Sequence, residues 1–207
     1  MDIDLKTKER PNLEAQLLAE EPQPTLSMHP GKFMLWLFIV SIVMIFAAFT
    51  SAYLVRQAEG NWLEFELPAI FWFNSAVLLA SSVCMHWAYV AAKKDRLGSL
   101  KTAITLAFAL GMTFLVGQWI GWGQLVNINV YFGGNGSNPS GSFLYVLTGV
   151  HALHLISGLI VLLVAVVAAF RYRIHSKNTL RIELCATYWH FLDVLWLYLF
   201  VFLLLNH

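Results

Sequence analysis

Five long apolar runs dominate this chain and limit what it can fold into. Each run matches or exceeds the roughly 20 apolar residues that a helix needs to cross the hydrocarbon core of a bilayer. Buried helices of a soluble domain would need only about half this length. The sequence therefore predicts an all-α, polytopic membrane protein, a bundle of five transmembrane helices over residues 33–55, 68–92, 102–126, 142–170 and 184–205.

The composition agrees with a membrane location. Hydrophobic residues make up 58% of the chain and charged residues only 12%, whereas soluble domains contain about 25% charged residues. The 13 lysines and arginines nearly balance the 12 acidic residues, which gives a net charge of +1. This balance supplies no basic field that would attract nucleic acid, so we expect no nucleic-acid partner.

The first 31 residues form a polar tail that differs from everything after it. They contain six acidic residues, three basic residues and four prolines. No basic segment followed by a short apolar segment and a cleavage site is present, so we expect no secretory signal peptide. A segment of this composition buries too little apolar surface to order itself. We therefore predict a largely disordered tail over residues 1–31, which contacts a partner's soluble face, and a membrane domain over residues 32–207.

Basic residues gather in two of the predicted loops, 93–101 and 171–181. Lysine and arginine near the ends of transmembrane helices favour the cytoplasmic side of a membrane. This bias predicts a cytoplasmic N-terminus and an external C-terminus. The basic residues concerned are Lys93, Lys94, Arg96, Lys101, Arg171, Arg173, Lys177 and Arg181.

The last two apolar runs carry ionisable side chains in their interior. His151 and His154 lie in the fourth run, and Glu183, His190 and Asp193 lie in or beside the fifth. A charge at the bilayer centre costs at least roughly 2.5–3.5 kcal/mol, so such side chains usually face other protein. At about 1.5 Å per residue, His151 and Asp193 reach similar depths from opposite membrane faces. We predict that these five side chains, called the polar seam below, form an interhelical hydrogen-bond network.

Two other interpretations of the polar seam stay open at this point. Two histidines three residues apart, with a third on another helix, are compatible with haem or metal ligation. Ionisable groups inside a membrane are also typical of proton relays. Hydrogen bonding is the favoured interpretation because polar side chains of neighbouring transmembrane helices commonly bond to one another.

Two ordered motifs resemble a known family. The segment T-G-V-H-A-L-H-L-I-S-G at 148–158 resembles the G-x-H-G-L-H-V-x-x-G signature of subunit III of haem–copper oxidases. The segment E-L-C-A-T-Y-W-H-F-L-D-V-L-W at 183–196 resembles the E-A-x-x-x-Y-W-H-F-V-D-V-V-W segment of the same family. The second motif includes the aromatic residues Tyr188, Trp189 and Trp196. Weaker similarity covers nearly everything after the polar tail.

The resemblance implies an accessory subunit of a respiratory terminal oxidase in a bacterial inner membrane, with a periplasmic C-terminus. Such a subunit has no catalytic, cofactor-binding or metal-binding residues of its own, because haem and copper lie in partner subunits. It packs mainly on subunit I, with subunits II and IV nearby, and supports proton uptake and stability. Bound phospholipid and a supercomplex with a quinol-oxidising complex are further expectations.

Alternatives stay open for the electron donor and for the class of function. The resemblance favours cytochrome c as donor, and a quinol oxidase is the first alternative. A haem-binding membrane cytochrome and a small transporter are the rivals from other classes. Inverted repeats and broken midspan helices, which are typical of transporters, are not evident in the sequence.

The chain also departs from the family pattern. Many members have seven helices, so the five predicted here resemble a short form without the first two. Ile42 stands where the family usually has a glutamate, and Gly121 replaces a second glutamate of the third span. Roles that the family assigns to those two carboxylates therefore cannot be transferred to this chain.

Overall fold

The computed structural model describes residues 29–63, 65–134, 136–171 and 179–206. Most of the predicted polar tail therefore lies outside the described residues. The chain separates into two compact units, Met1–Met34 and Leu35–His207. Within the first unit, the carbonyl of His29 accepts a hydrogen bond of 2.8 Å from the Lys32 backbone N–H at the start of a helix. The contacts described below belong to the second unit.

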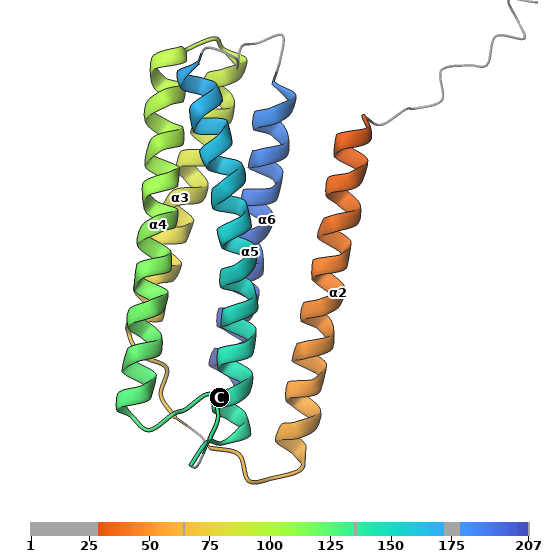
Figure 1. Cartoon of the computed structure of the whole chain (residues 1–207), viewed down its shortest axis with the longest axis vertical. Coiled ribbons are helices and arrows are strands. Elements are labelled where there is room, and N and C mark those ends of the chain that lie inside the picture. Colours follow the sequence, from red (N-terminus) through yellow and green to blue (C-terminus); the bar gives the residue numbers. More distant parts are fainter. Residues whose placement is uncertain (1–28, 64, 135, 172–178, 207) are drawn as a thin grey trace, which may run out of the picture. The chain divides into compact units, whose positions relative to one another are not determined.

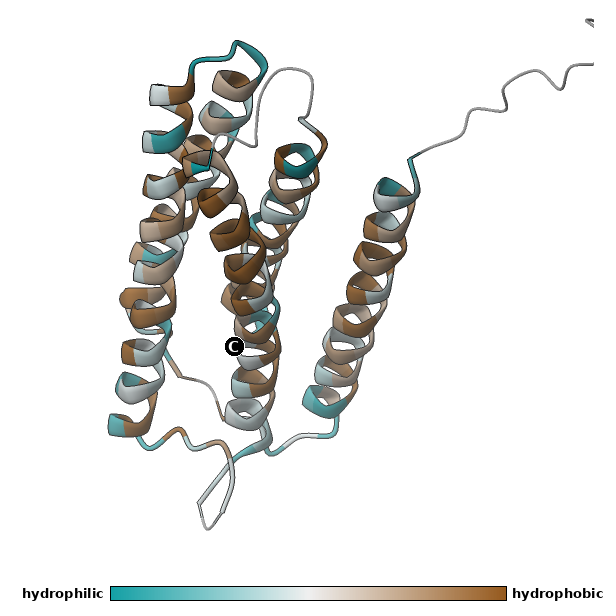
Figure 2. Cartoon of the chain, turned by 45° about the horizontal axis from the view of Figure 1, so that its top comes forward, coloured by the Kyte–Doolittle hydropathy of each residue, from teal (hydrophilic) through white to brown (hydrophobic). Residues whose placement is uncertain are grey.

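Five helices account for most of the described residues, and each is long and apolar enough to cross a membrane. The prediction of an all-α, five-span protein is confirmed, and the described residues contain no strand. Hydrophobic residues occupy the middles of the helices and hydrophilic ones gather toward their ends (Figure 2). The helices are α2 (Pro30–Ala58), α3 (Ile70–Lys93), α4 (Leu97–Asn127), α5 (Pro139–Phe170) and α6 (Leu180–Asn206), drawn in Figure 1.

Helices α2, α4, α5 and α6 start earlier than the hydropathy pattern predicts. Polar residues at the membrane surface interrupt an apolar run but do not interrupt a helix, because water can satisfy the free backbone groups of the first turn. The start of α5 shows the local reason: Asn138 has an extended backbone and Pro139 follows at the first helical position. The Asn138 side chain accepts a hydrogen bond of 3.1 Å from the Ser140 backbone N–H, as an N-cap residue does.

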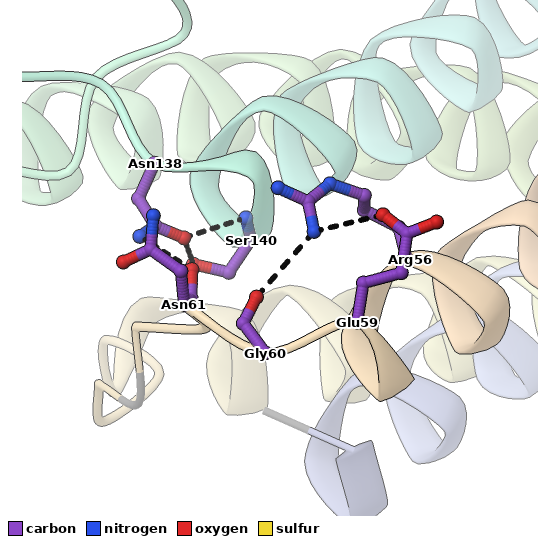
Figure 3. Close-up of polar contacts among 6 residues, drawn as sticks. All are labelled: Arg56, Glu59, Gly60, Asn61, Asn138 and Ser140. Carbon is purple, nitrogen blue, oxygen red and sulfur yellow. Dashed lines mark hydrogen bonds and ion pairs between the residues drawn. The ribbon is translucent and has the colours of Figure 1, made fainter.

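Asn138 also fixes the loop between α2 and α3 (Figure 3). Its Nδ2 donates to the carbonyl of Asn61 at 3.0 Å, and its Oδ1 accepts from the Leu63 N–H at 3.2 Å. Gly60 has a φ of +84°, which a glycine adopts without strain. Two loops that are far apart in sequence are thereby joined at one end of the bundle.

Four helices form a closed ring in which α3 packs on α4, α4 on α5, α5 on α6 and α6 on α3. Glycines allow the close approach of these helices. A Cβ atom at Gly111 would lie 2.7 Å from Cη2 of Trp189, and one at Gly117 would overlap the Asn74 amide. Hence the ring has little room between α4 and its neighbours.

Helix α2 lies outside this ring. Among the described residues, no Cα atom of α2 comes within 8 Å of a Cα atom of another helix. Side chains bridge the distance: the Phe46 ring lies 5.9 Å from the His154 ring, and Tyr198 donates to the Thr50 hydroxyl at 3.2 Å. At the far end, Tyr53 donates to the carbonyl of Asn206 at 2.7 Å.

Candidate functional site

The polar seam predicted on α5 and α6 is divided among separate environments. His151 is fully buried and contacts α4 and α6. Its ring lies 6.0 Å from Phe114 and 5.2 Å from Trp196. Neither ring nitrogen has a hydrogen-bond partner among the described protein groups. The predicted contact between the fourth and fifth spans exists at His151, but its partner there is an aromatic ring.

His154 points toward α2 instead. Its Nδ1 lies 2.8 Å from the carbonyl of Val150, one turn earlier on α5. The rings of Phe38 and Phe46 lie 6.4 Å and 5.9 Å from the imidazole. The two histidines of the motif therefore face different neighbours, so they do not converge on one ligand.

His190 and Asp193 face α3. The Nδ1 atom of His190 lies 2.7 Å from the hydroxyl of Ser82, and 4.0 Å from Oδ2 of Asp193. The Asp193 residue is 3% exposed, and neither carboxyl oxygen makes a direct hydrogen bond within the described protein. The predicted network of all five side chains is therefore not formed by direct hydrogen bonds, because His151 and Asp193 do not reach each other.

Glu183 lies apart from the other four, in the first turn of α6. Its backbone carbonyl accepts a hydrogen bond of 2.9 Å from the Thr187 hydroxyl. Its carboxylate interacts electrostatically with Lys93 at the end of α3. Glu183 thus belongs to the end of the bundle that carries the basic α3–α4 loop.

The three aromatic residues of the second motif each bind a serine on another helix. Trp189 Nε1 donates to Ser81 at 3.1 Å, and Trp196 Nε1 donates to Ser75 at 3.0 Å. The Tyr188 hydroxyl lies 2.7 Å from the hydroxyl of Ser157 on α5. In each contact the aromatic ring packs between helices while its N–H or O–H group is hydrogen-bonded. These contacts join α6 to α3 and α5, its two neighbours in the helix ring.

Several polar residues of the helices were not part of the predicted polar seam. Asn74 and Gln118 are at most 1% exposed, and their side-chain polar atoms have no hydrogen-bond partner among the described groups. Ser82 and His86 lie beside His190 on α3. His86 gave a signal, since it is the single ionisable residue inside an otherwise uncharged run, but nothing in the sequence reveals which helix it faces.

The arrangement offers hydrogen bonding and proton exchange more readily than metal binding. Within the described ranges, no three His, Cys, Asp or Glu side chains converge as the ligands of a metal ion would. Ionisable groups buried in a membrane protein commonly hold or pass protons. The expectation that this chain holds no haem or metal stays a prediction.

Comparison with known proteins gives a consistent result. The family model of cytochrome c oxidase subunit III matches residues 23–206. Proteins named cytochrome c oxidase subunit 3 are similar: that of Pylaiella littoralis is 32% identical over 198 residues, and that of Petromyzon marinus 34% over 182. These alignments cover 87% and 80% of this chain, and 69% and 65% of the relatives. The protein of that name from Thermostichus vulcanus is 28% identical over 82% of this chain and 84% of its own length.

Proposed function

Because the chain belongs to the cytochrome c oxidase subunit III family, we propose that it is the accessory subunit III of a bacterial haem–copper oxidase that reduces oxygen and translocates protons. The observation that carries the proposal is the family match over residues 23–206, which includes both helix motifs. In the structure the motifs are adjacent, since Tyr188 of the second bonds to Ser157 of the first.

In this role the chain packs on subunit I, with subunits II and IV nearby, and supports proton uptake and stability. The haem and copper centres belong to the partner subunits. The names of the relatives support cytochrome c rather than quinol as electron donor. A supercomplex with a quinol-oxidising complex stays part of the proposal.

The proposed orientation places the N-terminus in the cytoplasm and the C-terminus in the periplasm. Lys93 ends α3, and Lys94 and Arg96 lie between α3 and α4. Arg171 and Arg181 lie at the end of α5 and the start of α6. Figure 1 shows these helix ends at the same end of the bundle. Positive residues in short loops favour the cytoplasmic side.

A groove between α2 and α6 supports the expectation of a bound phospholipid. Its volume is about 430 Å³, and its lining is apolar apart from the Tyr198 hydroxyl. A lipid acyl chain matches this lining, because a groove in the membrane-spanning part of the chain opens toward hydrocarbon. The lining residues are Val43, Phe46, Ala47, Phe191, Val194, Leu195 and Tyr198.

Affinity purification of a tagged chain from its native membranes tests the proposal. We expect an oxidase complex with haem absorbance that oxidises reduced cytochrome c, and a separated chain without haem or stoichiometric metal. A chain that purifies alone with its own haem would contradict the proposal and favour the membrane cytochrome. Oxidation of quinol but not cytochrome c by the complex would contradict only the proposed donor.

A further inference from the structure

A row of polar side chains runs along the contact between α3 and α6. On α3 the spacing of three or four residues places its members on one face. On α6 the corresponding spacing is seven and three residues, which again keeps the side chains on one face. We call this set the α3–α6 row: Ser82, His86, Tyr89 and Lys93 of α3, with Glu183, His190 and Asp193 of α6.

In the outer part of the row, successive side chains contact one another through their aromatic rings. The Nζ atom of Lys93 lies 4.4 Å from the centre of the Tyr89 ring. The Tyr89 and His86 ring centres are 6.4 Å apart, and those of His86 and His190 are 6.2 Å apart. Each contact places one polar side chain beside the next, and water molecules can bridge polar atoms that do not touch directly.

The inner part of the row ends at a buried acid. His190 Nδ1 lies 2.7 Å from the Ser82 hydroxyl and 4.0 Å from Asp193 Oδ2. The second distance is too long for a direct hydrogen bond, but one water molecule or a small side-chain rotation closes it. Among the contacts described, the two histidines of α5 take no part in this row, since His151 contacts Trp196 and His154 contacts the phenylalanines of α2.

Along the inner part of the row, exposure falls from His86 to Asp193. His86 is exposed, the His190 side chain is 35% exposed and the Asp193 side chain is 4% exposed. With a helical rise of 1.5 Å per residue, His86 lies about 10 Å from the Lys93 end of α3, and Asp193 lies about 20 Å from the start of α6. The row therefore leads from the basic end of the bundle to a depth well inside a core of about 30 Å.

We propose that the α3–α6 row is a proton path through which Asp193 exchanges its proton with water at the basic end of the bundle. His86 takes a proton from water at one ring nitrogen and releases one from the other. His190 repeats this step and passes a proton to the carboxylate of Asp193, and the reverse sequence returns it. No electron moves and no other bond changes. The path ends at Asp193, which makes the acid a proton store rather than part of a channel.

This inference gives the proton-uptake role of the proposed function a physical path. It rests on the proposed function only where it assigns the path a part in oxidase turnover. Proton exchange at Asp193 is measured without turnover. Subunit content and oxidase activity of the same preparation report on the proposed function, so either idea can fail while the other holds.

The test is infrared spectroscopy of the purified complex during transfer from H₂O to D₂O. The carboxyl band of Asp193 is identified by subtracting the spectrum of an Asp193→Asn complex. We expect the band to shift within seconds in the natural protein. Loss of a positioned acid–base group typically slows proton transfer by roughly 10²–10⁴-fold, so His86→Leu and His190→Gln should slow the shift by about 100-fold.

His154→Leu is the matched control, because it removes a histidine that faces α2 and that, among the contacts described, touches no member of the row. It should leave the rate of the band shift unchanged. Of the two row variants, His86→Leu should disturb folding less, since within the described part of the chain the exposed His86 makes only the two aromatic contacts given above.

Three results would overturn the proposal. One is an unchanged exchange rate in both row variants, which would mean that Asp193 reaches water by another route. A second is equal slowing by His154→Leu, which would point to a general structural effect. The third is the absence of any protonated Asp193 band that exchanges with D₂O, because an acid that never holds or exchanges a proton stores none.

Discussion

Helices α2 and α3 both lie against α6, but they are held to it in different ways. Helix α3 comes close to α6, and its serines Ser75 and Ser81 accept hydrogen bonds from Trp196 and Trp189. Helix α2 contacts α6 through long side chains, such as Phe38 against Tyr188 with ring centres 5.7 Å apart. Small polar residues thus permit close packing inside a membrane, whereas large aromatic residues hold two helices apart.

The largest effect is expected from a bulky residue at the close contact between α3 and α6. Ser81→Leu should destabilise the chain by about 2–4 kcal/mol, because it overfills a tightly packed contact and leaves the Trp189 N–H without an acceptor. Thermal denaturation of the purified complex, followed by subunit content, measures the loss.

Ser41→Leu provides the matched control for that prediction. Ser41 lies on α2, is exposed, and bonds only to the carbonyl of Phe38 one turn earlier among the contacts described. The same substitution there should change the denaturation midpoint little. Equal losses from the two variants would contradict the idea that close packing distinguishes α3 from α2.

Ile42→Glu tests whether residue 42 of α2 faces His154 across the contact between α2 and the four-helix ring. Ile42 is 1% exposed and lies one turn from both Phe38 and Phe46, whose rings flank His154. A glutamate there should be tolerated because His154 offers it a hydrogen-bonding partner. In a His154→Leu background the same change should cost about 2.5–3.5 kcal/mol, as an unpartnered ionisable group in a membrane does.

A double-mutant cycle on thermal stability measures that difference. Equal effects of Ile42→Glu in the two backgrounds would show that residue 42 does not face His154. The single variant His154→Leu separates the loss of the imidazole from the effect of the new carboxyl group.

Asp193→Ala should weaken the contact between α3 and α6. The change removes a buried side chain that packs beside Ser82 and His190, and a loss of about 0.5–3 kcal/mol is typical when a single substitution leaves a cavity in a packed contact. We expect reduced retention of this subunit during purification, while the remaining complex still reduces oxygen. Subunit content and the initial rate of oxygen consumption per haem are the measurements.

Asp193→Asn keeps the volume of the side chain and should retain the subunit better than Asp193→Ala. If Asp193→Ala left assembly intact and removed the initial rate altogether, Asp193 would take part directly in the reaction, contrary to the accessory role.

Tyr198→Phe should have the smallest effect. It removes the 3.2 Å hydrogen bond to Thr50, one of the few polar contacts between α2 and α6. Hydrogen bonds between transmembrane helices average about 0.6 kcal/mol, and Thr50 keeps its bond to the carbonyl of Phe46. A shift in the denaturation midpoint as large as that of Ser81→Leu would mean that α2 depends on this single contact.

The sequence singled out some of the polar side chains that the structure places inside a span. It identified Asp193 and His190 as buried or partly buried polar groups inside a span, because hydropathy makes such residues conspicuous. It did not predict that they face α3, where Ser82 and His86 lie. Helical periodicity gives the relative angles of residues on one helix, but it does not give the rotation of that helix toward its neighbours.

The number, position and approximate length of the membrane spans were determined by the sequence alone, because apolar length is a local property that the bilayer thickness selects. The partners of each polar side chain were decided only by the tertiary structure. His151 and His154 are three residues apart on α5, yet one contacts Trp196 and the other contacts α2. Which helices are neighbours depends on the summed packing of all five helices, and no single segment carries that information.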